Sequence, residues 1–265
     1  MTNKTRNLQL KWPVLAVVIT VLALLAVFLH ALLAVVLAMA CLTLIHLGAM
    51  TLSAVLFRAR LKQISIFYMP YVCDFGIGET RIRVGSLPLG GCIDLLSAED
   101  MPATAEREVA VTIPRPRLLQ EDLRPWQLII VNLSGPLALL VSAALVLGFT
   151  GTANSWLLGF PQLFIGALNP STVGKDLLTA FLRLIQGQFL VAGALLSTKV
   201  AAFNCLPLGP SNGGRVLVQL VRWLSGRDLP AGVLWYEITG FLVYFALWVM
   251  WVVAFVLALY EGALN

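Results

Sequence analysis

The chain has 265 residues, of which 59% are hydrophobic and 12% are charged, and its mean hydropathy is +0.89. This apolar share excludes a water-soluble globular domain and indicates an all-α polytopic membrane protein. The net charge of +5 is therefore expected to orient membrane spans and not to bind nucleic acid.

The first region, residues 1–57, is expected to hold a cytoplasmic N-terminus and two transmembrane helices. Residues 13–57 carry no Lys, Arg, Asp or Glu, whereas a single crossing needs only about 20 apolar residues. The run is too long for the hydrophobic part of a cleavable signal peptide. We therefore predict two helices joined by a tight turn near Leu29 and His30.

The second region, residues 58–125, is a polar insert. Ile64–Phe67 and Thr80–Val84 alternate apolar with polar residues, and Gly and Pro interrupt the sequence between and after them. These patterns are typical of short strands and turns. We predict a small membrane-associated β-loop in the first half of the insert and a solvated connector in the second half.

The third region, residues 126–265, is expected to contain three more transmembrane helices, at about 126–149, 178–203 and 231–259. This gives about five spans in all. Lys and Arg are concentrated in residues 1–12, 58–125 and 205–230. By the positive-inside rule, the N-terminus and the insert are expected in the cytoplasm and the C-terminus outside.

Three stretches of the chain carry recognisable motifs. Residues 78–92 run from Gly-Glu-Thr to Leu-Pro-Leu-Gly-Gly-Cys, residues 134–138 read Ser-Gly-Pro-Leu-Ala, and residues 204–215 read Asn-Cys-Leu-Pro-Leu-Gly-Pro-Ser-Asn-Gly-Gly-Arg. In this order and spacing, they resemble the reentrant β-loop, the Ala-Gly-Pro-Leu-Ala-Asn segment and the Asn-x-x-Pro-x-x-x-Leu-Asp-Gly-Gly segment of the site-2 protease family of intramembrane zinc metalloproteases. The resemblance implies a site-2-protease-like helical core.

The resemblance also implies where a catalytic zinc would lie, and there the sequence departs from the family. Family members supply His-Glu-x-x-His on a helix and the Asp of Leu-Asp-Gly, which give three zinc ligands and a general base. Two alignments of the helix remain open. One places Ile45 and Ala49 at the His positions and His46 at the Glu, and the other places His46 and Met50 at the His positions and Leu47 at the Glu.

Either alignment loses the general base and at least one zinc ligand. Asn212 stands at the position of the zinc-binding Asp, and its neutral amide is a poor zinc donor. We therefore expect no intact catalytic residue, no metal site of the family type and no cofactor, although zinc is the cofactor of the family. His46 is expected to be a hydrogen-bonded core residue.

A Pro/Gly-broken segment at membrane depth must line a cavity or be covered by protein, so residues 204–214 are expected to line a groove. By resemblance, this groove and the β-loop hold a partly unwound substrate helix, with residues 80–84 as an edge strand for main-chain capture. The predicted groove residues are Asn204, Pro207, Asn212, Gly213, Gly214 and Lys199. The predicted β-loop residues are Thr80, Arg81, Ile82, Arg83, Val84, Pro88, Gly90 and Gly91.

Lys199 lies inside a predicted span, where an unpaired ammonium is costly. Two interpretations stay open. Its charge either replaces that of zinc and holds the side chains of Asn204, Asn212 or Glu237, or the side chain snorkels to the membrane surface. Glu237 is likewise either interfacial or a buried partner.

These observations predict a proteolytically inactive pseudoenzyme that binds transmembrane segments or a membrane partner, as an adaptor, a chaperone or a regulator of proteolysis. The alternatives are an active intramembrane metalloprotease with a non-standard site, and a small transporter or complex subunit that uses Lys199 and Glu237. The expected partners are membrane lipid and a transmembrane protein or substrate helix. The expected location is the bacterial inner membrane, as a multi-pass protein with a cytoplasmic N-terminus.

Overall fold

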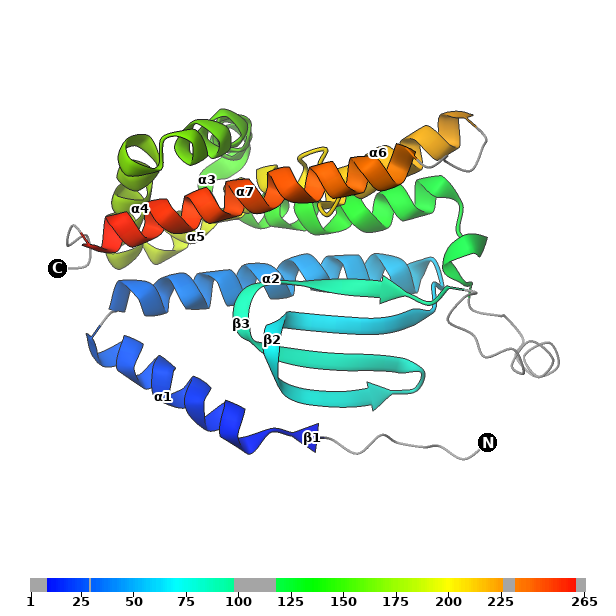
Figure 1. Cartoon of the computed structure of the whole chain (residues 1–265), viewed down its shortest axis with the longest axis horizontal. Coiled ribbons are helices and arrows are strands. Elements are labelled where there is room, and N and C mark those ends of the chain that lie inside the picture. Colours follow the sequence, from blue (N-terminus) through cyan, green and yellow to red (C-terminus); the bar gives the residue numbers. More distant parts are fainter. Residues whose placement is uncertain (1–8, 29, 98–117, 226–231, 261–265) are drawn as a thin grey trace.

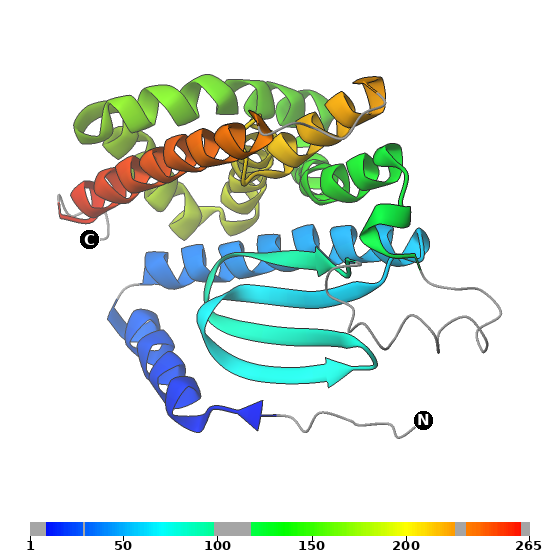
Figure 2. The same ribbon diagram turned by 45° about the vertical axis from the view of Figure 1, so that its right-hand side comes forward.

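The computed structural model describes residues 9–28, 30–97, 118–225 and 232–260. Figure 1 shows the helix α2 (His30–Leu56) between a small sheet and most of the other helices, and the turned view in Figure 2 repeats this layering. The preceding helix α1 (Trp12–Phe28) starts beside the sheet and leads to α2. The two predicted helices are thus present as α1 and α2, and their crossing of the membrane stays a prediction. Leu29 itself lies outside the described residues.

The sheet is built from two long strands that each bend and contribute to it twice. In β2 (Leu61–Ile77) and β3 (Thr80–Leu95), residues 91–95 pair with 61–66, residues 63–66 pair with 81–84, and 81–84 pair with 73–76. The short strand β1 (Gln9–Leu10) pairs with Asp74 and Cys73 on the far side. The predicted β-loop is thus a small sheet whose outer strand comes from the N-terminal segment.

The predicted edge strand at residues 80–84 is wrong. Ile82 pairs with Ile64 on one side and with Phe75 on the other, so this segment lies in the interior of the sheet. Residues 91–95 pair only with β2 among the described strands, and they form the edge. Alternation of apolar and polar residues identifies a strand, but its neighbours depend on register, which the pattern does not reveal.

The edge segment of β3 packs against α2. Ile93 and Leu61 share a buried cluster with Met50 and Ala54. At Gly91 a Cβ atom would lie 2.6 Å from Cδ1 of Leu47, so the absence of a side chain allows the strand to approach the helix closely. The edge strand therefore runs along the same helix that carries His46.

The helix α3 (Pro125–Leu168) follows a short 3-10 turn at Gln120–Asp122 and is much longer than the predicted span at 126–149. It kinks at Gly148, where φ is 70° and ψ is 169°. Gly148 ends the predicted span correctly, but a second helical segment continues to Leu168. A glycine with positive φ bends the chain without a clash between Cβ and the backbone, and the apolar run resumes after it.

The predicted span at 178–203 is also wrong, because two helices cover it. After a π-helical turn at Pro170–Gly174, α4 (Lys175–Gly187) ends at Gln188, whose φ of −139° and ψ of 65° are not helical, and α5 (Phe189–Asn204) follows. Leu182 and Ile185 are buried in α4, whereas Asp176 and Arg183 are exposed. This amphipathic pattern is typical of a helix that lies at a surface and does not cross a membrane.

Small polar residues join α3 and α5. The hydroxyl oxygens of Ser155 and Thr198 are 2.6 Å apart, those of Ser142 and Ser197 are 3.3 Å apart, and Ser197 also donates to the carbonyl of Leu139. Small side chains of this kind let helix backbones approach closely in a membrane. The two segments of α3 can thus both pack on α5.

The chain closes with α6 (Asn212–Ser225) and α7 (Gly232–Tyr260). Within the described ranges, three helices are long and apolar enough to cross a membrane, at His30–Leu56, Pro125–Leu168 and Trp235–Tyr260. Shorter apolar helices lie at Trp12–Ala23 and Phe189–Asn204. The three long helices agree with three of the predicted spans, and the count of five stays a prediction.

Candidate functional site

A polar cluster joins α2 to the first residue of α6. The amide nitrogen Nδ2 of Asn212 lies 3.1 Å from Nε2 of His46 and 3.6 Å from Sδ of Met50. His46 and Met50 are one helical turn apart, so both point to the same side of α2. Asn212 and Met50 are buried and His46 is half-buried. The two N–H groups of one amide thus satisfy an imidazole and a thioether.

The turn before α6 directs Asn212 towards α2. Ser211 caps the helix, because its Oγ accepts the backbone N–H of Gly214 at 3.0 Å. The turn is very tight, since a Cβ atom on Gly213 would lie 2.4 Å from the carbonyl oxygen of Cys205. The Ser-Asn-Gly-Gly sequence therefore fixes the direction of the Asn212 side chain.

Gly135 on α3 forms the wall behind the imidazole. A Cβ atom at this position would lie 2.6 Å from Cε1 of His46 and 2.7 Å from Nδ1. With the Asn212 amide as donor, Nε2 of His46 accepts and the ring proton sits on Nδ1. Nδ1 is buried and has no hydrogen-bond partner in the described parts of the chain. The glycine of the Ser-Gly-Pro motif thus makes room for the ring.

The irregular segment between α5 and α6 is covered by α7. The hydroxyl of Tyr236 donates to the carbonyl of Pro207 at 2.7 Å, and the backbone of Glu237 packs against Gly209. The Asn204 side chain donates to the carbonyl of Val200 on its own helix. Protein contacts therefore satisfy part of this backbone, as broken helices at membrane depth require. A groove lined by residues 204–214 stays a prediction.

Lys199 does not lie in the polar cluster. Its ammonium donates to the carbonyl of Ser155 on the second segment of α3. The prediction that it holds Asn204, Asn212 or Glu237 is wrong, because the first two bond elsewhere and Glu237 is exposed. The physical reason is the kink in α3, which brings a carbonyl of the returning helix within reach of the amine. The signal for that helix was the apolar run beyond Gly148.

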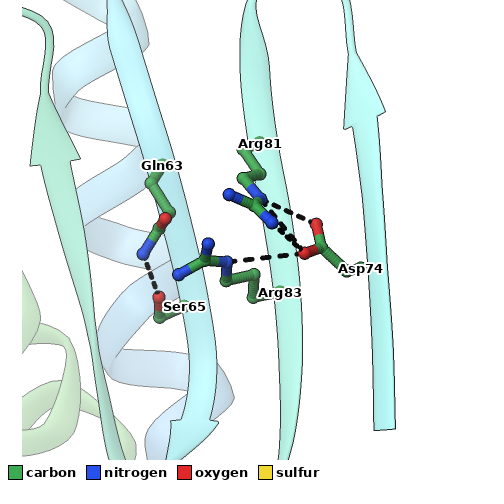
Figure 3. Close-up of polar contacts among 5 residues, drawn as sticks. All are labelled: Gln63, Ser65, Asp74, Arg81 and Arg83. Carbon is green, nitrogen blue, oxygen red and sulfur yellow. Dashed lines mark hydrogen bonds and ion pairs between the residues drawn. The ribbon is translucent and has the colours of Figure 1, made fainter. Parts of the chain in front are cut away.

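Two of the predicted β-loop residues serve the sheet itself. Figure 3 shows the guanidinium groups of Arg81 and Arg83 directed to the carboxylate of Asp74 on the neighbouring segment of β2. The hydrogen bond to Asp74 raises the pKa of Arg81 above its usual value. In the same view Gln63 donates to Ser65 at 2.7 Å. The arginines therefore tie strands together.

A bundle with three membrane-length apolar helices, joined through a polar cluster between α2 and a Pro/Gly-rich turn, defines an integral membrane protein. Residues 34–248 match the model of Peptidase family M50, and the chain belongs to this family, the site-2 protease family. A search of curated proteins found no match.

The cluster agrees with one of the two alignments with the family. His46 and Met50 both contact Asn212, as expected from the alignment that puts them at the two His positions and Leu47 at the Glu. Ile45, which the other alignment puts at the first His, is exposed. The sequence could not decide, because each alignment offers residues at the same i and i+4 spacing.

The residues at this position do not fit zinc. Zinc is bound by thiolate, imidazole or carboxylate groups, and only the imidazole of His46 is of this kind. The thioether of Met50 and the carboxamide of Asn212 are neutral and poor zinc donors. The amide also presents its nitrogen to the imidazole lone pair that a metal would use. No catalytic step can therefore be derived through a metal here.

Proposed function

We propose that this protein is a catalytically inactive member of family M50 that binds transmembrane segments or a membrane partner. The observation that carries the proposal is the hydrogen bond from Asn212 to His46. In this hydrogen bond the neutral amide of Asn212 engages the lone pair of the imidazole, which supports an inactive site if Asn212 stands for the family's charged ligand.

Peptide hydrolysis by a zinc enzyme needs a metal-bound water and a base to remove its proton. The carboxylate position is held by Leu47, which is 3% exposed and packs against β3. A buried aliphatic side chain cannot accept a proton. The absence of a base and the poor donor set both support an inactive protein.

The edge of the sheet supports a binding role. Residues 91–95 pair with β2 on one side only among the described strands, and Gly91 lets this edge approach the side chain of Leu47 on α2. An extended segment can add to such an edge through main-chain hydrogen bonds. A captured transmembrane segment would then lie beside the former catalytic position, where it is held but not cleaved. Such a protein can act as an adaptor, a chaperone or a regulator of proteolysis.

The proposed topology has the N-terminus and the insert in the cytoplasm of a bacterial cell, with the protein in the inner membrane. Pairing of Gln9 with Asp74 supports a common side for the N-terminal segment and the insert, because the two-helix hairpin of α1 and α2 lies between them. The distribution of Lys and Arg supports the cytoplasmic side. Reporter fusions at residues 110 and 265 should report opposite compartments.

Two native cysteines offer a matched test of the binding edge. Cys92 lies on the edge segment of β3, whereas Cys73 lies on the opposite side of the sheet and pairs with Leu10. A benzophenone probe placed on either cysteine alone, with the other cysteines replaced by serine, should crosslink a co-expressed transmembrane partner from Cys92 and far less from Cys73. Equal crosslinking from both positions would exclude capture at this edge.

The inactive state has a separate test. The purified protein should carry far less than one zinc per chain by elemental analysis and should show no chelator-sensitive cleavage of a membrane substrate. One zinc per chain together with such cleavage would establish the active-protease alternative.

A further inference from the structure

A pocket of about 610 Å³ opens where α2 meets the sheet. It is separate from the His46 cluster and lies between the end of α2, the start of β2 and the tip of the β2–β3 hairpin. Its lining residues are mostly aliphatic, and they include Val55, Leu61, Ile64, Ile77 and Ile82, together with Arg58. Pockets of this size suit small molecules or single chains rather than a folded partner.

Arg58 holds an unusual backbone conformation at this pocket. Its N–H bonds to the carbonyl of Val55 and the N–H of Ala59 bonds to that of Ala54, both at 2.9 Å, which is the Schellman pattern that ends a helix. The residue at this position takes a left-handed conformation, and here φ is 59°. Glycine is favoured there because any Cβ atom is strained. An arginine at this position accepts backbone strain that a glycine would avoid.

The guanidinium of Arg58 is exposed and has no ion-pair or hydrogen-bond partner in the described parts of the chain. The nearby Arg60 is different, because it forms a bidentate pair with Glu79 at the hairpin tip, with a shortest distance of 2.8 Å. That pair holds the hairpin near the end of α2. Arg58 is therefore the cation at the pocket that is left to meet an anion.

The position of the pocket relative to the membrane is marked by aromatic residues. Phe57 and Trp126 form an edge-to-face pair with ring centroids 5.5 Å apart, where α2 ends and α3 begins. Trp side chains at the ends of membrane-length helices, such as Trp126, are typical of the headgroup region. If the ends of α2 and α3 mark the headgroup region, Arg58 lies at the depth of lipid phosphates, beside an aliphatic pocket.

From these observations we infer that the pocket binds one acyl chain of an anionic phospholipid, with the lipid phosphate on Arg58. The aliphatic walls suit the chain, the free guanidinium suits the phosphate, and the depth brings both within reach of a single lipid. A zwitterionic lipid offers the same chain, but its positive headgroup opposes the cation. The site should therefore discriminate between lipids by charge.

Native mass spectrometry of the detergent-purified protein, with phosphatidylglycerol and phosphatidylcholine of identical acyl chains, tests this site. Phosphatidylglycerol should bind more tightly, and Arg58→Gln should weaken it about fivefold, since one cation near the surface contributes about that factor. Arg222→Gln, which removes an exposed cation from α6, should leave binding unchanged. Equal losses in the two variants would overturn the site.

Arg58→Gly separates folding from binding. Glycine relieves the left-handed backbone, so the variant should be at least as resistant to thermal unfolding as the native protein and yet lose its preference for phosphatidylglycerol. An unchanged preference would show that Arg58 does not contact the headgroup.

The acyl chain has its own test on α2. Val55→Trp fills the pocket and should reduce lipid binding, whereas Leu52→Trp places the same ring on an exposed position one turn away, outside the lining residues. Glycerol 3-phosphate, which lacks the chain, should not compete. Competition by it, or equal effects of both tryptophans, would refute binding of a lipid chain.

Discussion

The hydrogen bond between His46 and Asn212 can be tested by a double-mutant cycle with leucine. Asn212→Leu leaves Nε2 of His46 buried without a donor, and His46→Leu leaves an N–H of Asn212 without its acceptor. Leaving one buried polar group unsatisfied costs about 1–3 kcal/mol, whereas removing both partners can be nearly neutral. The double variant should therefore lose less stability than the sum of the losses in the two single variants.

The magnitude is limited by the membrane. Hydrogen bonds between membrane helices contribute about 0.6 kcal/mol on average and about 1.7 kcal/mol at most, because the unfolded helices also find partners in the bilayer. The contact with Met50 at 3.6 Å remains in the His46→Leu variant and retains part of the amide's satisfaction. We therefore expect a coupling energy of about 1 kcal/mol, with Asn212→Leu the more damaging single change.

The free energy of unfolding can be measured in mixed micelles with rising denaturing detergent. The four proteins to compare are the native protein, the two single variants and the double variant. The double variant should recover most of the stability lost in Asn212→Leu. Additive losses, with a coupling energy within error of zero, would show that the amide and the imidazole do not interact. The contact between the two side chains would then be van der Waals packing without a stabilising hydrogen bond.

Three further results follow from the same geometry. A triple variant with Leu47→Glu, Met50→His and Asn212→Asp rebuilds the zinc ligands and the general base of the family. It should bind one zinc per chain by elemental analysis, whereas Asn212→Asp alone should not. A triple variant without zinc would show that the helices are not placed to hold a metal. Gly135→Ala forces a methyl group into the imidazole ring and should cost about 1–3 kcal/mol in the same unfolding assay, and a neutral result would contradict the close approach. Lys199→Met removes a charge from a part-buried position together with its hydrogen bond to the carbonyl of Ser155, so stability should change little. Asn212→Asp should have equal effects with Lys199 and with Met at this position. A gain from Asn212→Asp that requires Lys199 would place the amine at the cluster.

Local chemistry made the site predictable in outline. Ser211 caps α6, and Gly213 lies close to the carbonyl of Cys205. Contacts between residues this near in the chain can be predicted from the local sequence. Long apolar runs likewise located the main helices. The alignment of His46 could not be predicted, because it depends on which side of α2 faces a residue far along the chain.

Two other features depended on tertiary structure in the same way. The interior position of Ile82 follows from strand register, and the alternation of residues is the same for an interior and an edge strand. The partner of Lys199 follows from the turn of α3 at Gly148, a single residue that a hydropathy pattern interprets as an end. In both cases the local sequence identified the element correctly, but it did not show which residues the element would contact.

His46 and Asn212 are 166 positions apart in the chain, and their hydrogen bond joins the first half of the fold to the second. A metal centre at this place would make that junction depend on what the cell can supply, since an empty site would leave its ligands unconnected. The amide and the imidazole need no such supply. Under the proposed function, assembly of α2 with α6 does not depend on zinc, and the protein is expected to fold equally well in zinc-starved and zinc-replete cells.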